Sequence, residues 1–193
     1  MRVSFFNELD SFAESLNLDP KNIIDVVSKD ERIGDYYNNP SFGFGGYCLP
    51  KDTQQLANEM ERAYPQSSLI QSINTSNKNR WKFVVDKILE FAKAKTNSEN
   101  LTIGIYKLAM KTGSDNFRDS SMLHIIELLK LYNCKIIIYE DLLQNEDKVL
   151  DSKICNDIDV FKSTCDVIVA NRYSKDLDSV KEKVYSRDIF HNN

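Results

Sequence analysis

The first hundred residues carry apolar side chains at the spacing of a helix. Near the start, the apolar positions are Val3, Phe5, Phe6, Leu9, Phe12, Ala13 and Leu16, and no capping residue precedes them. We therefore expect this helix to begin upstream of the printed chain. Further helices are expected over residues 23–27, over 53–64 with a cap from Asp52 or Thr53, and over 68–95. This half is expected to be almost entirely helical.

From residue 101 onward, short apolar runs alternate with helical segments. The expected strands are "LTIGIY" (101–106), "KIIIYE" (135–140) and "DVIVAN" (166–171), separated by expected helices over 122–133 and 156–164. Such alternation predicts parallel strands joined by right-handed crossovers, and the apolar run at 136–138 predicts a strand covered on both faces. The sequence therefore predicts an α + α/β fold, with a helical domain over residues 1–94 followed by a small three-layer α/β domain with a parallel sheet over 95–193.

The apolar stripes of residues 3–16 and 69–91 exceed what one small domain can cover. We therefore expect the helical part to be a dimerisation domain and the protein to be a homodimer.

Composition narrows the class of protein. The 193 residues are 41% hydrophobic and 28% charged, as in ordinary globular proteins, with no stretch long and apolar enough to cross a bilayer. The start "MRVSFFNELD" is not a signal peptide, so we expect a cytoplasmic protein without a membrane partner. The net charge of −4 is spread along the chain, which argues against nucleic-acid binding.

The cysteines argue against a metal site but leave one thiol to explain. Cys48, Cys134, Cys155 and Cys165 have no C-x-x-C spacing, and the chain has only two histidines, so no metal is expected. Cys134 and Cys165 stand beside apolar strands and are expected to be buried. Cys48 stands in a different context.

Three of the six glycines, Gly43, Gly45 and Gly46, lie within six residues of Cys48. Glycine permits a positive φ or a close approach of the backbone to another group. Lys51 would favour the ionised thiol, and Asp52 could orient water or accept a proton. These residue types alone leave two possibilities open, a covalent site and a buried turn cysteine before a helix.

The string "RIGDYYNNPSFGFGGYCLPKD" over residues 32–52, here called the thiol loop, resembles the catalytic cysteine loop of the UDP-glucose 6-dehydrogenase family of nucleotide-sugar dehydrogenases. The positions that match are Phe44, Gly45, Gly46, Cys48, Lys51 and Asp52. The resemblance also includes "FFNELD" (5–10), "YKLAMKTGSDNFRDSS" (106–121) and "KVYSRDIF" (183–190). It therefore covers nearly the entire chain.

The resemblance implies a reaction in which NAD oxidises the C6 alcohol of UDP-glucose twice, giving UDP-glucuronate. Cys48 resembles the residue that captures the intermediate aldehyde as a thiohemiacetal, which the second hydride transfer converts to a thioester. Asp52 resembles the carboxylate that positions or activates the hydrolytic water. A side chain at Gly45 or Gly46 would then occupy the space through which the sugar approaches the sulfur.

The same resemblance implies the binding residues. The glucose and diphosphate pocket is expected to be lined by Tyr37, Asn38, Asn39, Pro40, Ser41, Phe44 and Gly45. Arg32 resembles an arginine that reaches across the dimer interface to the neighbour's substrate. The simpler alternatives are that Tyr37 packs, that Arg32 is a solvated charge and that Asn39 forms a turn.

In the second half, Lys111 resembles the residue that holds the UDP end of the substrate. It stands on a strand-to-helix loop, where open parallel sheets usually bind ligands. Arg172, just after the third expected strand, is expected to be another substrate contact, with an exposed surface arginine as the alternative. Lys51 and Arg118 are expected to contact NAD.

The chain departs from the family in two respects. No G-x-G-x-x-G turn follows a strand, and the family's catalytic lysine and asparagine would fall just before Met1. The chain therefore resembles the carboxyl-terminal half of such an enzyme, NAD would be bound mainly by the missing amino-terminal domain, and the fragment alone is expected to be inactive.

Two functions remain open from the sequence. The first is a part of an NAD-dependent UDP-glucose dehydrogenase, with UDP-N-acetylmannosamine or GDP-mannose as alternative substrates. The second is a non-catalytic module that dimerises and binds a UDP-sugar.

Overall fold

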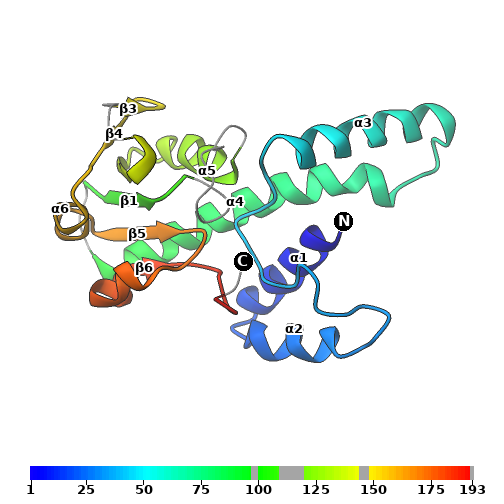
Figure 1. Ribbon diagram of the computed structural model, residues 1–193, viewed down its shortest axis with the longest axis horizontal. Helices are drawn as coiled ribbons and strands as arrows, with labels where there is room; N and C mark the ends of the chain where they lie inside the picture. Colours follow the sequence, from blue (N-terminus) through cyan, green and yellow to red (C-terminus); the bar gives the residue numbers. More distant parts are fainter. Residues whose placement is uncertain (97–99, 109–119, 144–147, 192–193) are drawn as a thin grey trace.

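The computed structural model in Figure 1 describes residues 1–96, 100–108, 120–143 and 148–191. Its α-helices are α1 (Arg2–Ser15), α2 (Pro20–Ser28), α3 (Cys48–Ala63), α4 (Leu69–Lys95), α5 (Ser121–Lys130) and α6 (Ile158–Thr164). Its strands are β1 (Thr102–Tyr106), β2 (Lys135–Tyr139), β3 (Lys148–Val149), β4 (Ser152–Ile154), β5 (Val167–Ala170) and β6 (Val184–Tyr185). Two 3₁₀ segments cover Asp141–Leu143 and Lys175–Lys183.

Helix α1 buries a face that is partly polar. Its buried residues are Ser4, Phe6, Asn7, Asp10 and Ala13. Phe5 and Phe12 of the helix and Leu16, which directly follows it, point outward instead and are 42%, 56% and 55% exposed. The apolar spacing correctly predicted a helix here, but much of the apolar surface lies away from the core.

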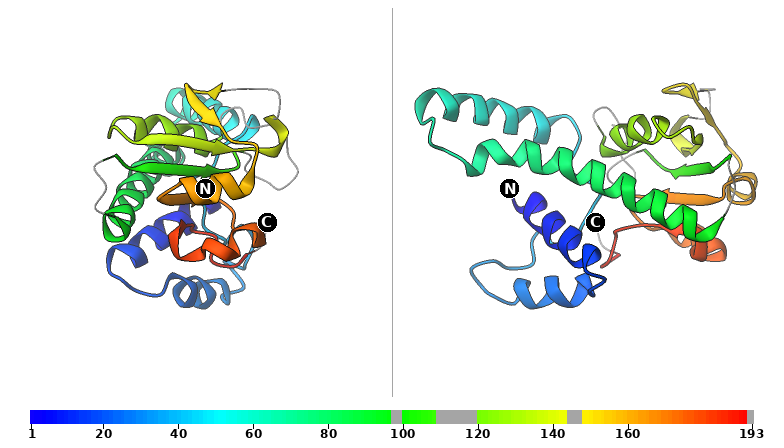
Figure 2. Two further views of the ribbon diagram at one scale, coloured as in Figure 1. Left: turned by 90° about the vertical axis from the view of Figure 1, so that its left-hand side faces the viewer. Right: turned by 180° about the vertical axis from the view of Figure 1, so that it is seen from behind.

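Helix α3 begins earlier than the sequence predicted. We expected Asp52 or Thr53 to cap it, but its first residue is Cys48. The expectation was wrong because Pro50 falls in the first turn, where a missing N–H costs nothing and proline is tolerated. Figures 1 and 2 show α3 and the amino-terminal half of α4 as an antiparallel hairpin that reaches away from the sheet, while the rest of α4 runs along the sheet.

The second half is a six-stranded sheet in the order β3-β4-β2-β1-β5-β6. All neighbouring strands run parallel except β3 and β4, which are antiparallel. The register of the central pair places Ile103 opposite Ile136 and Ile105 opposite Ile138. The expected parallel sheet is confirmed, and strands β3, β4 and β6 are additions of two or three residues each.

Helices cover both faces of the sheet, which gives the expected three layers. On one face, Ile103 and Ile105 of β1 pack in a cluster with Ile125 and Leu129 of α5. On the other face, Ile168 of β5 packs with Phe161 of α6 and Leu177 of the second 3₁₀ segment, among others. The carboxyl-terminal half of α4 shares the first cluster through Val84, Val85, Ile88 and Ala92, so this helix serves both halves. The division of the chain near residues 94–100 remains a proposal.

The two strand-associated cysteines differ in burial. Cys165 is 3% exposed, as expected. Cys134 is only partly buried, because it lies in the turn that leads into β2 rather than within the strand. Over the described residues, no helix is both long and apolar enough to cross a membrane.

Candidate active site around Cys48

Cys48 lies at the surface, at the first position of α3. Asp52 follows one helical turn later, so the two side chains share a face of the helix. Lys51 Nζ lies 3.7 Å from Asp52 Oδ1 and 4.7 Å from the centre of the Tyr47 ring. The first two turns of α3 therefore present a thiol, an ammonium group and a carboxylate to solvent.

The chain that leads to this helix is buried over residues 40–44, here called the clamped segment. It has no regular secondary structure, so its backbone N–H and C=O groups need partners outside a helix or sheet. Phe42 is 0% exposed and stacks on Tyr185, with 5.8 Å between the ring centres. The segment is thus anchored in the interior shortly before the exposed thiol.

Helices α1 and α4 supply hydrogen bonds from one side. The Ser41 N–H donates to Asn7 Oδ1 at 2.8 Å, and Arg80 Nε donates to Ser41 O at 2.9 Å. Asn77 bonds both backbone groups of one residue: the Phe44 N–H donates to its Oδ1 at 2.9 Å, and its Nδ2 donates to Phe44 O at 2.8 Å.

The α/β half supplies hydrogen bonds from the other side. Asn171 and Arg172 directly follow β5, at the carboxyl end of the sheet. The Phe42 N–H donates to Asn171 Oδ1 at 2.8 Å, and Arg172 Nη1 donates to Pro40 O at 2.7 Å. Burial lowers the pKa of Arg172, an effect that the nearby Asp188 carboxylate opposes. Arg172, expected to contact substrate, thus holds the thiol loop in this structure.

Two glycines in the loop are required for different reasons. Gly43 has φ +123°, and a Cβ there would lie 2.5 Å from Trp81 Nε1 and 2.8 Å from Asn77 Oδ1. Gly46 has φ +85°, but among the described residues no atom beyond its chain neighbours lies within 4 Å of the place of its Cβ. Close packing excludes a side chain at Gly43, whereas at Gly46 the backbone conformation favours glycine and the open space is available to a ligand.

The other candidate residues of the loop face different neighbours. Asn39 Nδ2 donates to Asp188 Oδ1 at 2.6 Å, and Asn38 Nδ2 donates to Ser28 Oγ at 3.2 Å. Tyr37 is 73% exposed, with a positive φ of 56°. The two asparagines therefore make tertiary contacts in addition to any turn, while the Tyr37 ring is available at the surface.

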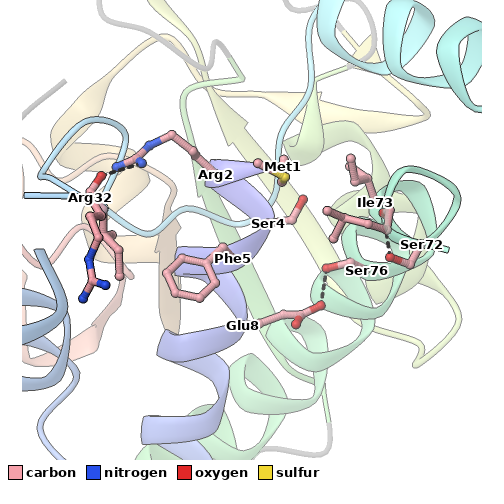
Figure 3. A pocket seen from close by; sticks show the side chains of 11 residues that line it. Met1, Arg2, Ser4, Phe5, Glu8, Arg32, Ser72, Ile73 and Ser76 are labelled. Carbon is pink, nitrogen blue, oxygen red and sulfur yellow. Dashed lines mark hydrogen bonds between the residues drawn. The ribbon is translucent and has the colours of Figure 1, made fainter. Parts of the chain in front are cut away.

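Arg32 lies apart from this cluster. Its guanidinium is 89% exposed and pairs with Asp30 at 2.6 Å, a hydrogen bond that raises the pKa of Arg32. Figure 3 shows Arg32 at one side of a hollow of about 410 Å³, Ile73 of α4 at the other side, and Phe5 and Met1 of the α1 region between them. Arg32 thus shares a hollow with exposed apolar side chains, and Cys48 is not among the residues that line it.

Two family models match the chain. Residues 1–79 match the central domain of the UDP-glucose/GDP-mannose dehydrogenase family, and residues 104–192 match the UDP binding domain of that family. The chain belongs to the UDP-glucose/GDP-mannose dehydrogenase family.

Individual relatives agree with this assignment. The chain is 48% identical to a UDP-glucose 6-dehydrogenase of Campylobacter jejuni over 99% of its own length and 47% of that protein. It is 46% identical to a UDP-glucose 6-dehydrogenase of Streptococcus pneumoniae over 98% of its length and 45% of that protein. The chain thus spans about half the length of these curated relatives.

Solved structures show the same fold. A UDP-glucose dehydrogenase from the archaeon Pyrobaculum islandicum superposes with a TM-score of 0.74 at 20% identity, over 88% of this chain and 39% of that one. A UDP-D-ManNAc dehydrogenase from Pyrococcus horikoshii gives a TM-score of 0.73 at 20% identity, over 96% and 43%.

Two residues that the family resemblance singled out, Lys111 and Arg118, lie outside the described residues. Gly45 is partly buried beside the clamped segment. Among the described residues, no group of three or more His, Cys, Asp or Glu side chains is arranged to hold a metal ion.

Sequence reasoning missed a buried charge cluster that supports the loop. Asp10 is 0% exposed and forms ion pairs with Arg80, at 2.6 Å, and with Arg187 of the carboxyl-terminal segment. Glu14, one turn later, lies 3.3 Å from Arg187, and burial raises the pKa of Glu14. Asn7, Asp10 and Ala13 stand at intervals of three positions and so share one helix face, which was the available signal that polar groups line the buried face.

Proposed function

We propose that this chain is the carboxyl-terminal part of an NAD-dependent UDP-glucose 6-dehydrogenase that oxidises UDP-glucose to UDP-glucuronate. The observation that carries the proposal is the exposed Cys48 thiol at the start of α3, following a segment that both halves of the chain hold in place. The names of the Campylobacter and Streptococcus relatives support UDP-glucose as the substrate.

In this proposal, Cys48 carries the substrate between two oxidations. NAD, when bound, accepts one hydride from C6 in each of them. The Cys48 sulfur adds to the C6 aldehyde, forming an S–C bond while the thiol proton passes to the aldehyde oxygen. After the second oxidation, water oriented by Asp52 attacks the thioester, the S–C bond breaks, and the carboxylate and the free thiol are released.

The binding roles are part of the same proposal. Arg32 is proposed to reach the substrate of a neighbouring subunit. The residues proposed to bind UDP-glucose within the chain are Tyr37, Asn38, Asn39, Pro40, Ser41, Phe44, Gly45, Lys111 and Arg172. NAD is assigned to Lys51 and Arg118, and mainly to a segment outside this chain, because the sequence has no glycine-rich turn between a strand and a helix. A cytoplasmic location is included in the proposal.

The test of the activity joins the chain to the amino-terminal part of the Campylobacter relative. With UDP-glucose and NAD, this fusion is expected to form two NADH per UDP-glucuronate, whereas the 193-residue chain alone forms none. Cys48→Ala in the fusion is expected to abolish UDP-glucuronate formation, and Cys155→Ala, at a partly buried cysteine in the other half, to leave it intact. UDP-glucuronate formation by Cys48→Ala at the parental rate would exclude the covalent role. Faster turnover of GDP-mannose or UDP-N-acetylmannosamine would reassign the substrate.

We also propose that a second copy of the chain covers the apolar face of α1. Phe5 and Phe12 are large exposed apolar side chains on that face, and Phe5 lines the hollow of Figure 3 together with Arg32. Covering this face with a copy would bring Arg32 to an interface, as its proposed role requires.

The dimer predicts a sedimentation result. At micromolar concentration, the wild-type chain is expected to sediment as a dimer and Phe5→Arg as a monomer, because the new charge would be buried in the interface. Val160→Arg, at a 52% exposed position of α6, is the matched control and is expected to remain dimeric. A wild-type chain that stays monomeric throughout this range contradicts both the interface and the role of Arg32.

A further inference from the structure

Three asparagines from three separate elements hold the clamped segment. Asn7 belongs to α1, Asn77 to α4, and Asn171 follows β5. The side-chain oxygens of these asparagines accept the backbone N–H groups of Ser41, Phe44 and Phe42, respectively, at 2.8–2.9 Å. All three asparagines are at least nine-tenths buried, with exposed fractions of 2%, 5% and 2%.

Asn77 differs from the other two because it bonds both backbone groups of a single residue. A primary amide offers one acceptor and one donor side by side, as a neighbouring strand would offer to Phe44. Substituting alanine would leave the N–H and the C=O of Phe44 without these partners in a buried site, where unpaired polar groups are costly. The bidentate contact therefore fixes the position of Phe44 relative to α4.

Phe44 is the last buried residue before the thiol. The chain continues through Gly45 and Gly46, which have no side chains to hold it, and through the exposed Tyr47 to Cys48. Helix α3, which begins at Cys48, packs against α4, the helix that carries Asn77. The clamp at Phe44 and the α3–α4 packing therefore determine together where the thiol lies.

We infer that Asn77 is a positioning residue for Cys48, which it places by holding the backbone of Phe44. This inference rests on the proposed role of Cys48 and adds a residue to which the family resemblance assigned no role. Asn7 and Asn171 hold the same segment at earlier positions by accepting the backbone N–H groups of Ser41 and Phe42, and Asn7 Nδ2 also donates to Ser41 Oγ at 3.4 Å.

The test compares Asn77→Ala with Asn79→Ala, which makes the same change at an exposed position of the same helix. Amide hydrogen exchange is measured at residues 44–48, and alkylation of Cys48 by iodoacetamide is measured alone, with UDP and with UDP-glucose. In the wild-type chain and in Asn79→Ala, UDP-glucose is expected to slow alkylation more than UDP does, because the hexose covers the sulfur. Asn77→Ala is expected to accelerate exchange of the Phe44 amide, which loses its bond to Asn77 Oδ1, by about tenfold or more. It is also expected to lose the protection of Cys48 by the hexose, while its affinity for UDP stays within about twofold.

Asn77→Asp provides a second variant that keeps the shape of the side chain. Its ionised carboxylate accepts from the Phe44 N–H but cannot donate to Phe44 O, whereas the protonated carboxyl can do both. The ionised carboxylate would place an unprotonated oxygen opposite Phe44 O, and the repulsion between them would weaken the contact. The protection factor of the Phe44 amide is therefore expected to be lower than in the wild-type chain at neutral pH and to recover on acidification. A purely steric role of Asn77 would give no such pH dependence.

The outcomes separate this inference from the proposed function. Unchanged exchange at Phe44 in Asn77→Ala, or protection by the hexose that survives this substitution, overturns the positioning role. If UDP-glucose fails to protect Cys48 in the wild-type chain, the proposed function of the thiol fails, and the exchange rate at Phe44 alone then decides whether Asn77 holds the segment that leads to α3.

Discussion

At the scale of single residues, Gly43 and Gly46 separate two uses of glycine within one loop. Both have a positive φ, which costs an L-residue free energy. Only Gly43 also faces the indole of Trp81 and the amide of Asn77 at less than 3 Å from the place of a Cβ. Gly43 therefore lets the clamped segment approach α4 closely enough for Asn77 to bond Phe44.

Alanine substitutions can measure this difference. Gly43→Ala is expected to lower the free energy of unfolding by about 2–4 kcal/mol, since backbone strain and a clash in a packed site add. At Gly46, a Cβ would meet no atom of the described residues beyond its chain neighbours, so Gly46→Ala is expected to lower the free energy of unfolding by about 1–2 kcal/mol from backbone strain alone. Urea unfolding of both variants measures the two losses in the free energy of unfolding. Equal losses would show that packing at Gly43 is unimportant.

A buried thiol predicts a pH dependence of stability. Burial raises the pKa of Cys165 to about 12, from an ordinary value of 9.0, although the Lys183 ammonium opposes the shift. The folded thiol therefore stays protonated where the unfolded thiol ionises, so its contribution to stability is intact below pH 9.0 and falls as the pH rises toward 12. The loss amounts to about 1.4 kcal/mol per pH unit. Urea unfolding between these pH values should show that the free energy of unfolding falls more steeply with pH in the wild-type chain than in Cys165→Ala. Equal slopes would contradict the raised pKa of Cys165.

At the scale of elements, α1 is held by charge rather than by apolar packing alone. Asp10 stands at the centre of its buried face and pairs with Arg80 of α4 and Arg187 of the carboxyl-terminal segment. Arg80 in turn donates to the carbonyl of Ser41. The charge cluster therefore connects the packing of α1 to the placement of the thiol loop.

Removing the Asp10 carboxylate is expected to destabilise the fold strongly. Asp10→Ala is expected to lower the free energy of unfolding by about 3–5 kcal/mol, because two arginines lose their buried partner. Asp86→Ala makes the same change at an exposed position of α4 and is expected to alter it by less than about 1 kcal/mol. Thermal and urea unfolding compare the two variants, and similar effects for both would mean that the buried cluster contributes little.

At the scale of the whole molecule, the helical and α/β halves share structure instead of merely adjoining. Helix α4 packs in the core beneath the sheet, and the clamped segment is bonded by residues of both halves. Trp81 stacks on His124 of α5 at 4.0 Å between ring centres, at the junction of the halves. These shared contacts predict that the halves unfold together.

The single tryptophan makes this prediction measurable. Trp81 fluorescence, which reports on the junction, and far-ultraviolet circular dichroism, which reports on all helices, are expected to give the same urea midpoint. Asn171→Ala is expected to lower both midpoints together by removing one bond between the halves. A fluorescence midpoint clearly below the dichroism midpoint would show that the junction opens before the halves unfold.

The sequence by itself determined the elements whose signal is local. Apolar spacing located the long helices and the three central strands, because helical and strand periodicities are set by neighbouring residues. The four-residue interval between Cys48 and Asp52 was also visible, and the structure places both on one face of a helix. The resemblance of the thiol loop to a family then supplied the candidate chemistry.

Only the tertiary structure decided how these elements are used. The start of α3 depended on where Pro50 falls within the first turn, and the buried face of α1 depended on the arginines that meet Asp10. The bonds that hold the clamped segment join residues 33 to 132 positions apart, as in the pairs Asn77–Phe44 and Arg172–Pro40. A single side chain that bonds a distant backbone group leaves no periodic pattern in the sequence, so the fold alone identifies Asn77 as a partner of the segment that carries Cys48.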